Sequence, residues 1–405
     1  MNKHSAAIIN ALGGASSVVI FGASRGAQYA IYVLRQLNIA IDCVVESSDM
    51  QSANLYARDQ VDRILGLEVL PLARGFKEYP KSKILITTMD SSSLVSLKTK
   101  IEGEGWQDSV WIMPDIIACY LDLFTTRSLN HDAFQKNKLQ LFHRASRTTN
   151  HNISPSVTVL INENCNLTCE HCSAFVPQNQ NPATFTVDSI YQSVKNYCDS
   201  FDFVYRACIM GGEPFLHRSL TRILEKLATI KNLLFIDIAT NGTVVPGNAT
   251  LDAVKRAGMC VEVSDYGIAS RKMEQLFSAC SDRGILTYHQ KYAYWGSLGQ
   301  IKNYHRTDAH LHSHFMHCIQ QPGTTNHIIG GVLYRCLTSG MASRLSLYPK
   351  AKSDQVNLLD ENLDATDLIK NVKDMTFRTH PLEACQHCSN GQFTVQAGIQ
   401  VSSPT

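Results

Sequence analysis

Segments that favour strands alternate with segments that favour helices from residue 156 to residue 292, and this alternation constrains the fold most strongly. Short apolar segments rich in β-branched residues predict strands at 156–161, 205–210, 233–239, 260–263 and 285–292. Helical patterns lie between them, at 188–199, 218–230, 251–257 and 273–282. The series predicts an α/β protein with a parallel sheet, arranged as a partial (β/α) barrel. In such folds the active site lies at the carboxyl ends of the strands.

A second α/β pattern precedes the barrel. Its predicted strands are 17–21, 41–45, 83–87 and 110–113, with a helix between the first two. We therefore expect four regions along the chain. They are a Rossmann-like domain over 1–125, a polar linker over 126–150, the partial barrel over 151–310 and a cysteine-rich domain over 311–405.

The turn after the first strand carries glycines at Gly22 and Gly26, and Glu46 ends the next strand. This arrangement resembles a degraded dinucleotide fingerprint, in which glycines admit a phosphate to a helix N-terminus and the acid binds a ribose. It is also similar to the Rossmann-like domains of bacterial sugar-modifying enzymes. A structural or docking domain without a bound nucleotide remains the alternative.

The net charge and the number of cysteines limit the classes of partner and chemistry that the chain can have. The 37 Lys and Arg nearly balance the 35 Asp and Glu, so net charge favours neither nucleic acid nor membrane as a partner. Without a secretory signal or a long apolar segment in view, we expect a cytoplasmic protein. The 13 cysteines of such a chain serve as metal ligands, catalytic thiols or small core residues, and their spacing decides which.

Three of these cysteines, Cys165, Cys169 and Cys172, lie within eight residues directly after the first barrel strand. Four thiolates complete the ligand shell of a cubane cluster, whereas three leave one iron open to a small molecule. The amino and carboxylate groups of S-adenosylmethionine (SAM) suit that open position. The alternative is a zinc knuckle in which His171 supplies a fourth ligand.

The Cys-x3-Cys-x2-Cys spacing resembles the signature of the radical SAM superfamily. The resemblance implies a [4Fe-4S] cluster on these three cysteines, with SAM bound to it. An aromatic residue usually precedes the third cysteine in this family. Here the position holds His171, which still offers a ring near the adenine.

Polar and glycine-rich turns end the next strands. Glycines admit close approach of a ligand to the backbone, and Gly211, Gly212, Glu213 and Pro214 resemble the family motif that binds the methionyl amine of SAM. Backbone carbonyls and Glu213 are the expected acceptors for that ammonium group. By the same resemblance, Asn241 and Ser264, at the ends of the two following strands, are expected to contact the ribose and carboxylate of SAM.

Four cysteines form a second group near the C-terminus, at Cys318, Cys336, Cys385 and Cys388. Their donor set suits a [4Fe-4S] cluster and tetrahedral zinc equally well. Their order, with a hairpin at 327–335 and a helix at 364–373, resembles the twitch domain, a shortened relative of the SPASM domain. That resemblance implies a second, auxiliary [4Fe-4S] cluster. We expect the histidines upstream (His310, His312, His314 and His317) to occupy a solvated polar loop.

The remaining cysteines are expected to be small buried residues, with Cys208 and Cys260 placed either in the core or along the site. These six are Cys43, Cys119, Cys198, Cys208, Cys260 and Cys280.

The resemblance implies a radical SAM oxidoreductase that abstracts hydrogen from a small molecule, with a one-electron donor such as flavodoxin or ferredoxin. The expected substrate is a carbohydrate, an aminocyclitol or a nucleotide-sugar alcohol. A peptide-modifying maturase and a non-enzymatic zinc-binding interaction protein are the alternatives. Four residues are candidates for the proton acceptor: Arg206, His217, His289 and Tyr294.

Overall fold

The computed structural model describes most of the chain from residue 153 onward and parts of the chain before it. The described residues are 17–22, 27, 30–31, 34, 39–46, 63–64, 67–86, 94–106, 110–112, 153–154, 156–292, 294–297, 301–316, 318, 326–348, 350–389 and 393–401. The chain divides into two compact units, 1–151 and 152–405.

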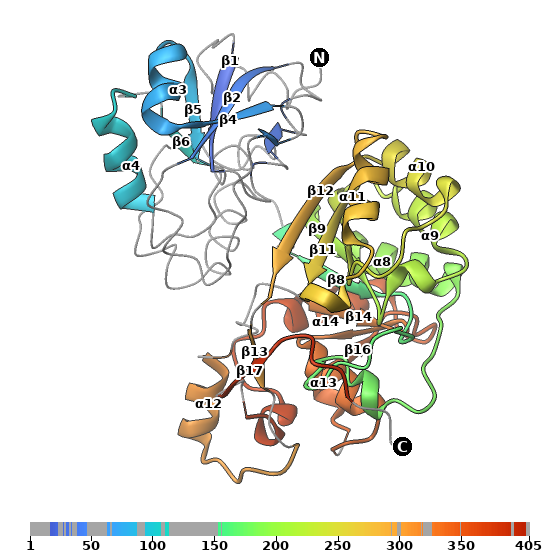
Figure 1. The fold of residues 1–405 in the computed structure, drawn as a ribbon. Helices are drawn as coiled ribbons and strands as arrows, with labels where there is room; N and C mark the ends of the chain where they lie inside the picture. The colour runs from blue at the N-terminus through green and yellow to red at the C-terminus, as the bar shows by residue number, and fades with distance from the viewer. Residues whose placement is uncertain are drawn as a thin grey trace. The chain divides into compact units, whose positions relative to one another are not determined.

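The first unit is built on a sheet whose strands follow the order β3-β4-β2-β1-β5-β6 (Figure 1). Neighbours from β4 to β6 pair in parallel, and β3 is antiparallel to β4. The strands are β1 (Ser17–Phe21), β2 (Ala40–Glu46), β3 (Arg63–Ile64), β4 (Leu67–Pro71), β5 (Lys83–Ile86) and β6 (Val110–Ile112), and the helices α3 (Leu72–Glu78) and α4 (Leu94–Gly103).

This unit confirms the predicted parallel sheet and leaves its ligand untested. Trp106 is 1 % exposed in a core with strand residues such as Val19 and Ile84, and it anchors the end of α4 to the sheet. Gly22 has φ +95°, the left-handed backbone that a tight turn after β1 requires. Residues 23–26 lie outside the described residues, so nucleotide binding by this turn stays a prediction.

The second unit contains the predicted β/α series as one continuous sheet. Its order is β12-β11-β10-β9-β8-β14-β15-β16, and neighbours from β12 to β14 pair in parallel. The strands are β7 (Ile153–Ser154), β8 (Val157–Leu160), β9 (Phe203–Met210), β10 (Leu233–Thr240), β11 (Cys260–Asp265), β12 (Leu286–Lys291), β14 (Asn326–Ile329), β15 (Val332–Tyr334) and β16 (Gln355–Asn357). The five predicted barrel strands are therefore confirmed.

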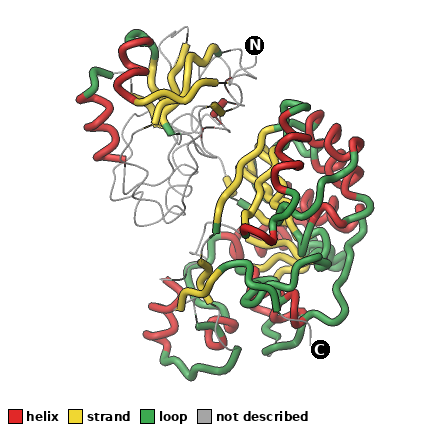
Figure 2. Tube along the Cα trace, viewed as in Figure 1, coloured by secondary structure: helices red, strands yellow, loops and turns green. Residues whose placement is uncertain are grey.

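Helices cover one face of this sheet (Figure 2). They are α8 (Val187–Asp199), α9 (Leu220–Leu227), α10 (Asn248–Arg256) and α11 (Met273–Ser281). Side chains alternate along a strand, so Ala207 and Ile209 of β9 join the core beneath these helices. Arg206, Cys208 and Met210 face the opposite side, where the strands curve around the barrel interior.

The C-terminal part adds short elements to the same unit. They are β13 (Tyr294–Ser297), α12 (Asp308–Met316), α13 (Leu337–Arg344), α14 (Ala365–Thr376) and β17 (Phe393–Gln396), with 3-10 turns at Val176–Gln178, Pro214–Leu216, Gly267–Ala269, Lys352–Asp354 and Glu383–His387. The predicted hairpin is confirmed as β14–β15, which turns at Gly330 and Gly331 with positive φ. The predicted helix is confirmed as α14, which begins after Asp364, whose side chain accepts from the Asp367 N–H.

The prediction of a polar loop around His310, His312 and His314 was wrong, because these residues lie on α12; His317 is outside the described residues. This helix is largely exposed and contributes Phe315 to the interior, so it lacks the apolar face that identifies a helix from sequence. Among the described helices, none has the length and apolar composition needed to cross a membrane.

Candidate functional site

The cysteine loop leaves β8 at the carboxyl edge of the sheet and borders a cavity of about 390 Å³. Cys165, Cys169 and Cys172 all line this cavity. The loop is tightly turned: the Cys172 N–H donates to the Cys169 carbonyl at 3.3 Å, and His171 has φ +56°, rare for a residue with a side chain. The structure therefore brings the three predicted thiols to one cavity, with His171 also in its lining.

Two glycines bring the end of β9 against this loop. A Cβ on Gly211 would lie 1.9 Å from Asn162 Oδ1, and one on Gly212 would lie 2.3 Å from the Asn164 carbonyl oxygen. The space is filled by backbone hydrogen bonds, from Gly212 N to Asn162 O at 3.0 Å and from Glu213 N to Asn164 O at 2.8 Å. Glycine is therefore required here for a close approach, and both glycines line the cavity.

Glu213 follows the two glycines but is not part of the cavity lining. Its side chain is fully buried and accepts hydrogen bonds from Phe215 N at 3.0 Å, Thr240 Oγ1 at 2.8 Å and Asn241 N at 2.9 Å. Burial raises the pKa of this carboxyl to about 7 even though the three donors favour its charged form. Glu213 thus ties the end of β9 to the end of β10, and with Pro214 it stands outside the cavity lining, where the sequence had suggested an ammonium acceptor.

Asn241 connects β10 with the cysteine loop. Its Nδ2 lies 3.1 Å from Asn166 Oδ1 and 3.6 Å from Cys165 Sγ, and its Oδ1 accepts from Thr243 N at 3.0 Å. Asn241 and Ser264 both line the cavity, as expected of residues at the carboxyl ends of neighbouring strands.

An aromatic wall that the sequence analysis missed completes the cavity. It consists of Tyr266, Tyr292 and Trp295. The rings of Tyr266 and Trp295 are in an edge-to-face arrangement with centroids 5.3 Å apart, and the Tyr292 ring lies 6.0 Å from that of Tyr266. Tyr266 directly follows β11 and Tyr292 directly follows β12, and this position after a barrel strand was the available signal.

Of the four candidate proton acceptors, the three whose side chains the structure describes do not line the cavity. His217 is buried with both ring nitrogens in use: Nε2 lies 2.9 Å from the Phe185 carbonyl and Nδ1 accepts from Ser219 N at 3.1 Å. Tyr294 is 64 % exposed and absent from the cavity lining. The side chain of His289 lies outside what the structure describes.

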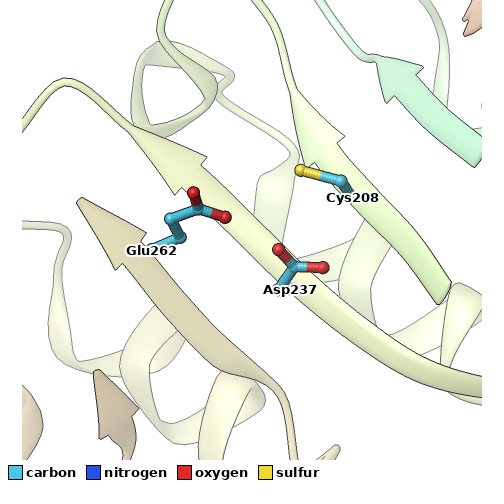
Figure 3. A group of neighbouring side chains, drawn as sticks. All are labelled: Cys208, Asp237 and Glu262. Carbon is cyan, nitrogen blue, oxygen red and sulfur yellow. The ribbon is translucent and has the colours of Figure 1, made fainter. Parts of the chain in front are cut away.

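Arg206, the fourth candidate, belongs to an ion-pair network on the inner face of the sheet. Figure 3 shows Cys208, Asp237 and Glu262 converging from neighbouring strands, an arrangement that could suggest a metal site. However, Arg206 donates from Nε to Asp237 Oδ1 at 2.7 Å and from Nη2 to the other carboxylate oxygen, and the same Nη2 is 3.3 Å from Glu262 Oε2. The two buried carboxylates therefore share the Arg206 guanidinium as a cation.

A second, smaller cavity of about 60 Å³ is lined by Cys318, Cys336, Cys385 and Cys388. Burial raises the pKa of Cys385 above its usual range, and the charges of Cys336, Cys318 and Cys388 raise it further. Arg306 anchors the Cys-x2-Cys turn by donating to the carbonyls of Cys385 at 2.9 Å and Cys388 at 2.8 Å. The structure thus brings all four predicted thiols together.

Most of the other cysteines are buried. Cys43, Cys198, Cys208, Cys260 and Cys280 are each at most 5 % exposed, and Cys119 lies outside the described residues. None of the five lines either cavity.

Comparison with known proteins identifies the central segment. Residues 159–267 match the Radical SAM superfamily. GTP 3',8-cyclase of Helicobacter pylori (strain HPAG1) is 28 % identical over 148 residues, 36 % of this chain and 41 % of that protein. GTP 3',8-cyclase of Aquifex aeolicus (strain VF5) is 26 % identical over 133 residues, 31 % of this chain and 39 % of that protein. The chain therefore spans about two fifths of the length of these relatives.

Among solved structures, the chain is similar to BtrN in complex with AdoMet and 2-DOIA. The identity is 14 % and the TM-score 0.39, covering 61 % of this chain and 97 % of that one. The matched segment 159–267 contains the cysteine loop, the glycine turn and Asn241, which are the residues that the fold gathers around the larger cavity. The segment that builds the larger cavity is therefore similar to the radical SAM superfamily.

Proposed function

We propose that this chain is an oxidoreductase that cleaves SAM reductively and abstracts hydrogen from a small-molecule substrate. The observation that carries the proposal is the convergence of three thiols and a glycine turn on one cavity of about 390 Å³.

The donor set of the loop suits an iron–sulfur cluster with one open iron. The three thiols would hold such a cluster, and the cavity that they border would admit a small molecule to the remaining iron. His171 lines the cavity as well, but it lies between two ligating cysteines, which makes a single tetrahedral zinc site less suitable. We therefore assign Cys165, Cys169 and Cys172 as ligands of a [4Fe-4S] cluster.

The residues around the open position are suited to SAM. The backbone of Gly211 and Gly212 borders the cavity without intervening side chains, so its polar groups can reach the methionyl end of SAM. We assign Asn241 and Ser264, which line the cavity, to the ribose and carboxylate of SAM, and we assign the His171 ring to its adenine. When bound, the cluster and SAM supply a 5′-deoxyadenosyl radical for hydrogen abstraction.

The protein contributes orientation and exclusion of water. Tyr266, Tyr292 and Trp295 form a wall that shields the cavity, and Glu213 fixes the β10 end without contacting the ligand. The ion-pair network of Arg206 fills the inner face of the sheet with fixed charges. The three aromatic residues of the wall would orient a substrate in the cavity.

We assign a second [4Fe-4S] cluster to Cys318, Cys336, Cys385 and Cys388. All four thiols border one cavity of about 60 Å³, and we favour a cluster over zinc because the order of the four cysteines along the chain resembles the twitch domain. A cluster held there would supply an acceptor for the electron left on the substrate radical, and a base would take up the proton released in the same oxidation. An external protein such as flavodoxin or ferredoxin would supply the first electron.

The substrate class rests on the overall plan of the chain. A parallel α/β unit precedes the barrel, and two cysteine sites follow. This plan favours a carbohydrate, an aminocyclitol or a nucleotide-sugar alcohol as the substrate. A peptide-modifying maturase commonly carries a winged-helix-like leader-binding domain, and the five parallel strands of the first unit differ from such a domain.

The test is anaerobic incubation of the reconstituted protein with SAM and dithionite, followed by measurement of 5′-deoxyadenosine. The wild-type chain should contain about eight iron and eight sulfide and produce 5′-deoxyadenosine. Cys169→Ala should abolish the product, because it removes a ligand of the SAM-binding cluster. Cys388→Ala should retain some uncoupled cleavage, because it affects the second cluster alone.

Two results would contradict the proposal. Turnover that survives Cys169→Ala would show that the ligands are assigned wrongly. If protein prepared anaerobically contains zinc and no sulfide, the chain is better explained as a non-enzymatic zinc-binding interaction protein.

A further inference from the structure

A C-terminal segment, residues 397–401, lies along the cysteine loop. Glu170 N donates to the Ile399 carbonyl at 2.7 Å, and Val401 N donates to the Thr168 carbonyl at 2.8 Å. These bonds flank Cys169, which forms an antiparallel bridge with Gln400. A segment about 230 residues away in sequence is thus paired with the loop that carries the three thiols.

The Gln400 side chain completes this pairing with both ends of its amide. Oε1 accepts from Thr168 N at 2.7 Å, while Nε2 donates to Cys169 Sγ at 3.0 Å and to the Gly398 carbonyl at 2.8 Å. These three hydrogen bonds fix the orientation of the Gln400 amide. Rotating its N–H away from the Cys169 sulfur would also break the bonds to Thr168 N and the Gly398 carbonyl.

The segment itself is held in place. Gly398 has φ +72°, and a Cβ at this position would lie 2.7 Å from Cβ of Tyr266, a residue of the aromatic wall. Ala397 is 8 % exposed. The amide of Gln400 therefore reaches Cys169 from a backbone that is packed against the cavity wall.

A hydrogen bond to a cluster-ligating sulfur favours the more negative, reduced state of the cluster and raises its reduction potential. From this geometry we infer that Gln400 is a positioning residue that sets the reduction potential of the cluster on Cys165, Cys169 and Cys172. The inference rests on the proposed function, because it requires a cluster at that loop. It makes the C-terminal segment part of the electron-accepting site.

The experiment is an anaerobic redox titration of the full-length reconstituted protein, following the electron paramagnetic resonance signal that SAM perturbs. Gln400→Leu removes the donor while roughly preserving volume. Gln400→Glu keeps an acceptor for Thr168 N but puts a carboxylate oxygen beside the sulfur. The control is Gln396→Leu, an exposed residue of β17 for which the described structure records no side-chain bond to the loop.

The potential should fall in Gln400→Leu and fall further in Gln400→Glu, with iron content and the response to SAM retained; Gln396→Leu should leave it unchanged. If the Gln400→Leu protein loses the cluster, the potential of the Gln400→Glu protein tests the inference, because the carboxylate introduced there can still accept the hydrogen bond from Thr168 N. A wild-type potential in a fully loaded Gln400→Leu or Gln400→Glu protein would overturn the inference, as would loss of the cluster in both. A wild-type protein without a SAM-responsive signal would instead overturn the proposed function.

Discussion

Glu213 illustrates how a residue can be essential to a site without facing it. Its motif suggested a partner for an ammonium group, yet its carboxylate accepts three hydrogen bonds from the protein. A motif reveals that a carboxylate is needed at this position, but the direction in which the side chain points depends on the next strand, β10. The groups that border the cavity are those of Gly211 and Gly212.

His327 provides a pH-dependent contribution to stability. It lies on β14, is 5 % exposed, and its Nδ1 has no hydrogen-bond partner within the described structure. Burial, with a smaller effect from the charge of Arg335, lowers its pKa to about 3. In the unfolded chain the His327 ring binds a proton near pH 6.5, whereas in the folded chain it stays neutral down to about pH 3. The folded state therefore loses stability as the pH falls below 6.5.

The unfolding free energy should therefore decrease by about 2 kcal/mol between pH 6.5 and pH 5 because of His327, at about 1.4 kcal/mol per pH unit. Urea unfolding of the metal-free protein across this range measures the loss. His327→Gln should have a correspondingly smaller pH dependence. Equal slopes for the two proteins would show that the ring is protonated in the folded state.

At the scale of elements, the glycine turn after β9 determines whether the cysteine loop can close. In Gly212→Ala the added Cβ would lie 2.3 Å from the Asn164 carbonyl oxygen and 2.8 Å from Cys165 Cβ, and the backbone oxygen cannot move without opening the loop. We expect this variant to lose the loop cluster, so that iron falls from about eight to about four per chain.

The matched control is Gly247→Ala at the start of α10, where an added Cβ meets no atom within 4 Å. It should retain its full iron content. Iron and sulfide analysis compares the two proteins after identical reconstitution. A fully loaded Gly212→Ala protein would show that the close approach is dispensable.

Elements with a strong local pattern were predictable from sequence. The barrel strands β8 to β11 are short segments rich in apolar and β-branched residues, and turn residues bound them. The hairpin β14–β15 was visible because Gly330 and Gly331 allow its turn. In contrast, α12 lacks an apolar face and β16 has only three residues, so neither has a pattern that distinguishes it from a loop.

At the scale of the whole molecule, contacts between distant segments escaped prediction. The parallel pairing of β14 with β8 makes the C-terminal part an extension of the barrel sheet. The pairing of β13 with β17 places Trp295 in the cavity wall, and Gln400 reaches the cysteine loop. Such pairings depend on where separate segments meet in space, and no spacing within either segment encodes them.

One buried ion pair joins the barrel to the C-terminal part. Arg344 of α13 donates from Nε to Glu163 Oε1 at 2.6 Å, and the Glu163 side chain is 4 % exposed. Its second oxygen accepts from Asn179 Nδ2 and Ala183 N, both at 3.0 Å. In Arg344→Met the carboxylate would remain buried without its cation, which should cost about 3 kcal/mol of unfolding free energy.

Urea unfolding measures this cost, and Lys370→Met provides the comparison. Lys370 pairs with Asp374 on the surface of α14, with side chains 69 % and 65 % exposed, so its loss should cost far less than the loss of Arg344. Similar costs for the two variants would show that the Glu163–Arg344 pair does not hold the C-terminal part to the barrel.

The central claim is that the cluster on Cys165, Cys169 and Cys172 has one iron open to SAM. Iron-57 Mössbauer spectroscopy of the anaerobic protein, recorded with and without SAM, tests it most directly. We predict that SAM changes the spectrum of one iron site per chain, and that Cys169→Ala eliminates this response. Spectra that stay identical while SAM is bound, or a cysteine loop that contains a single tetrahedral metal, would contradict the account.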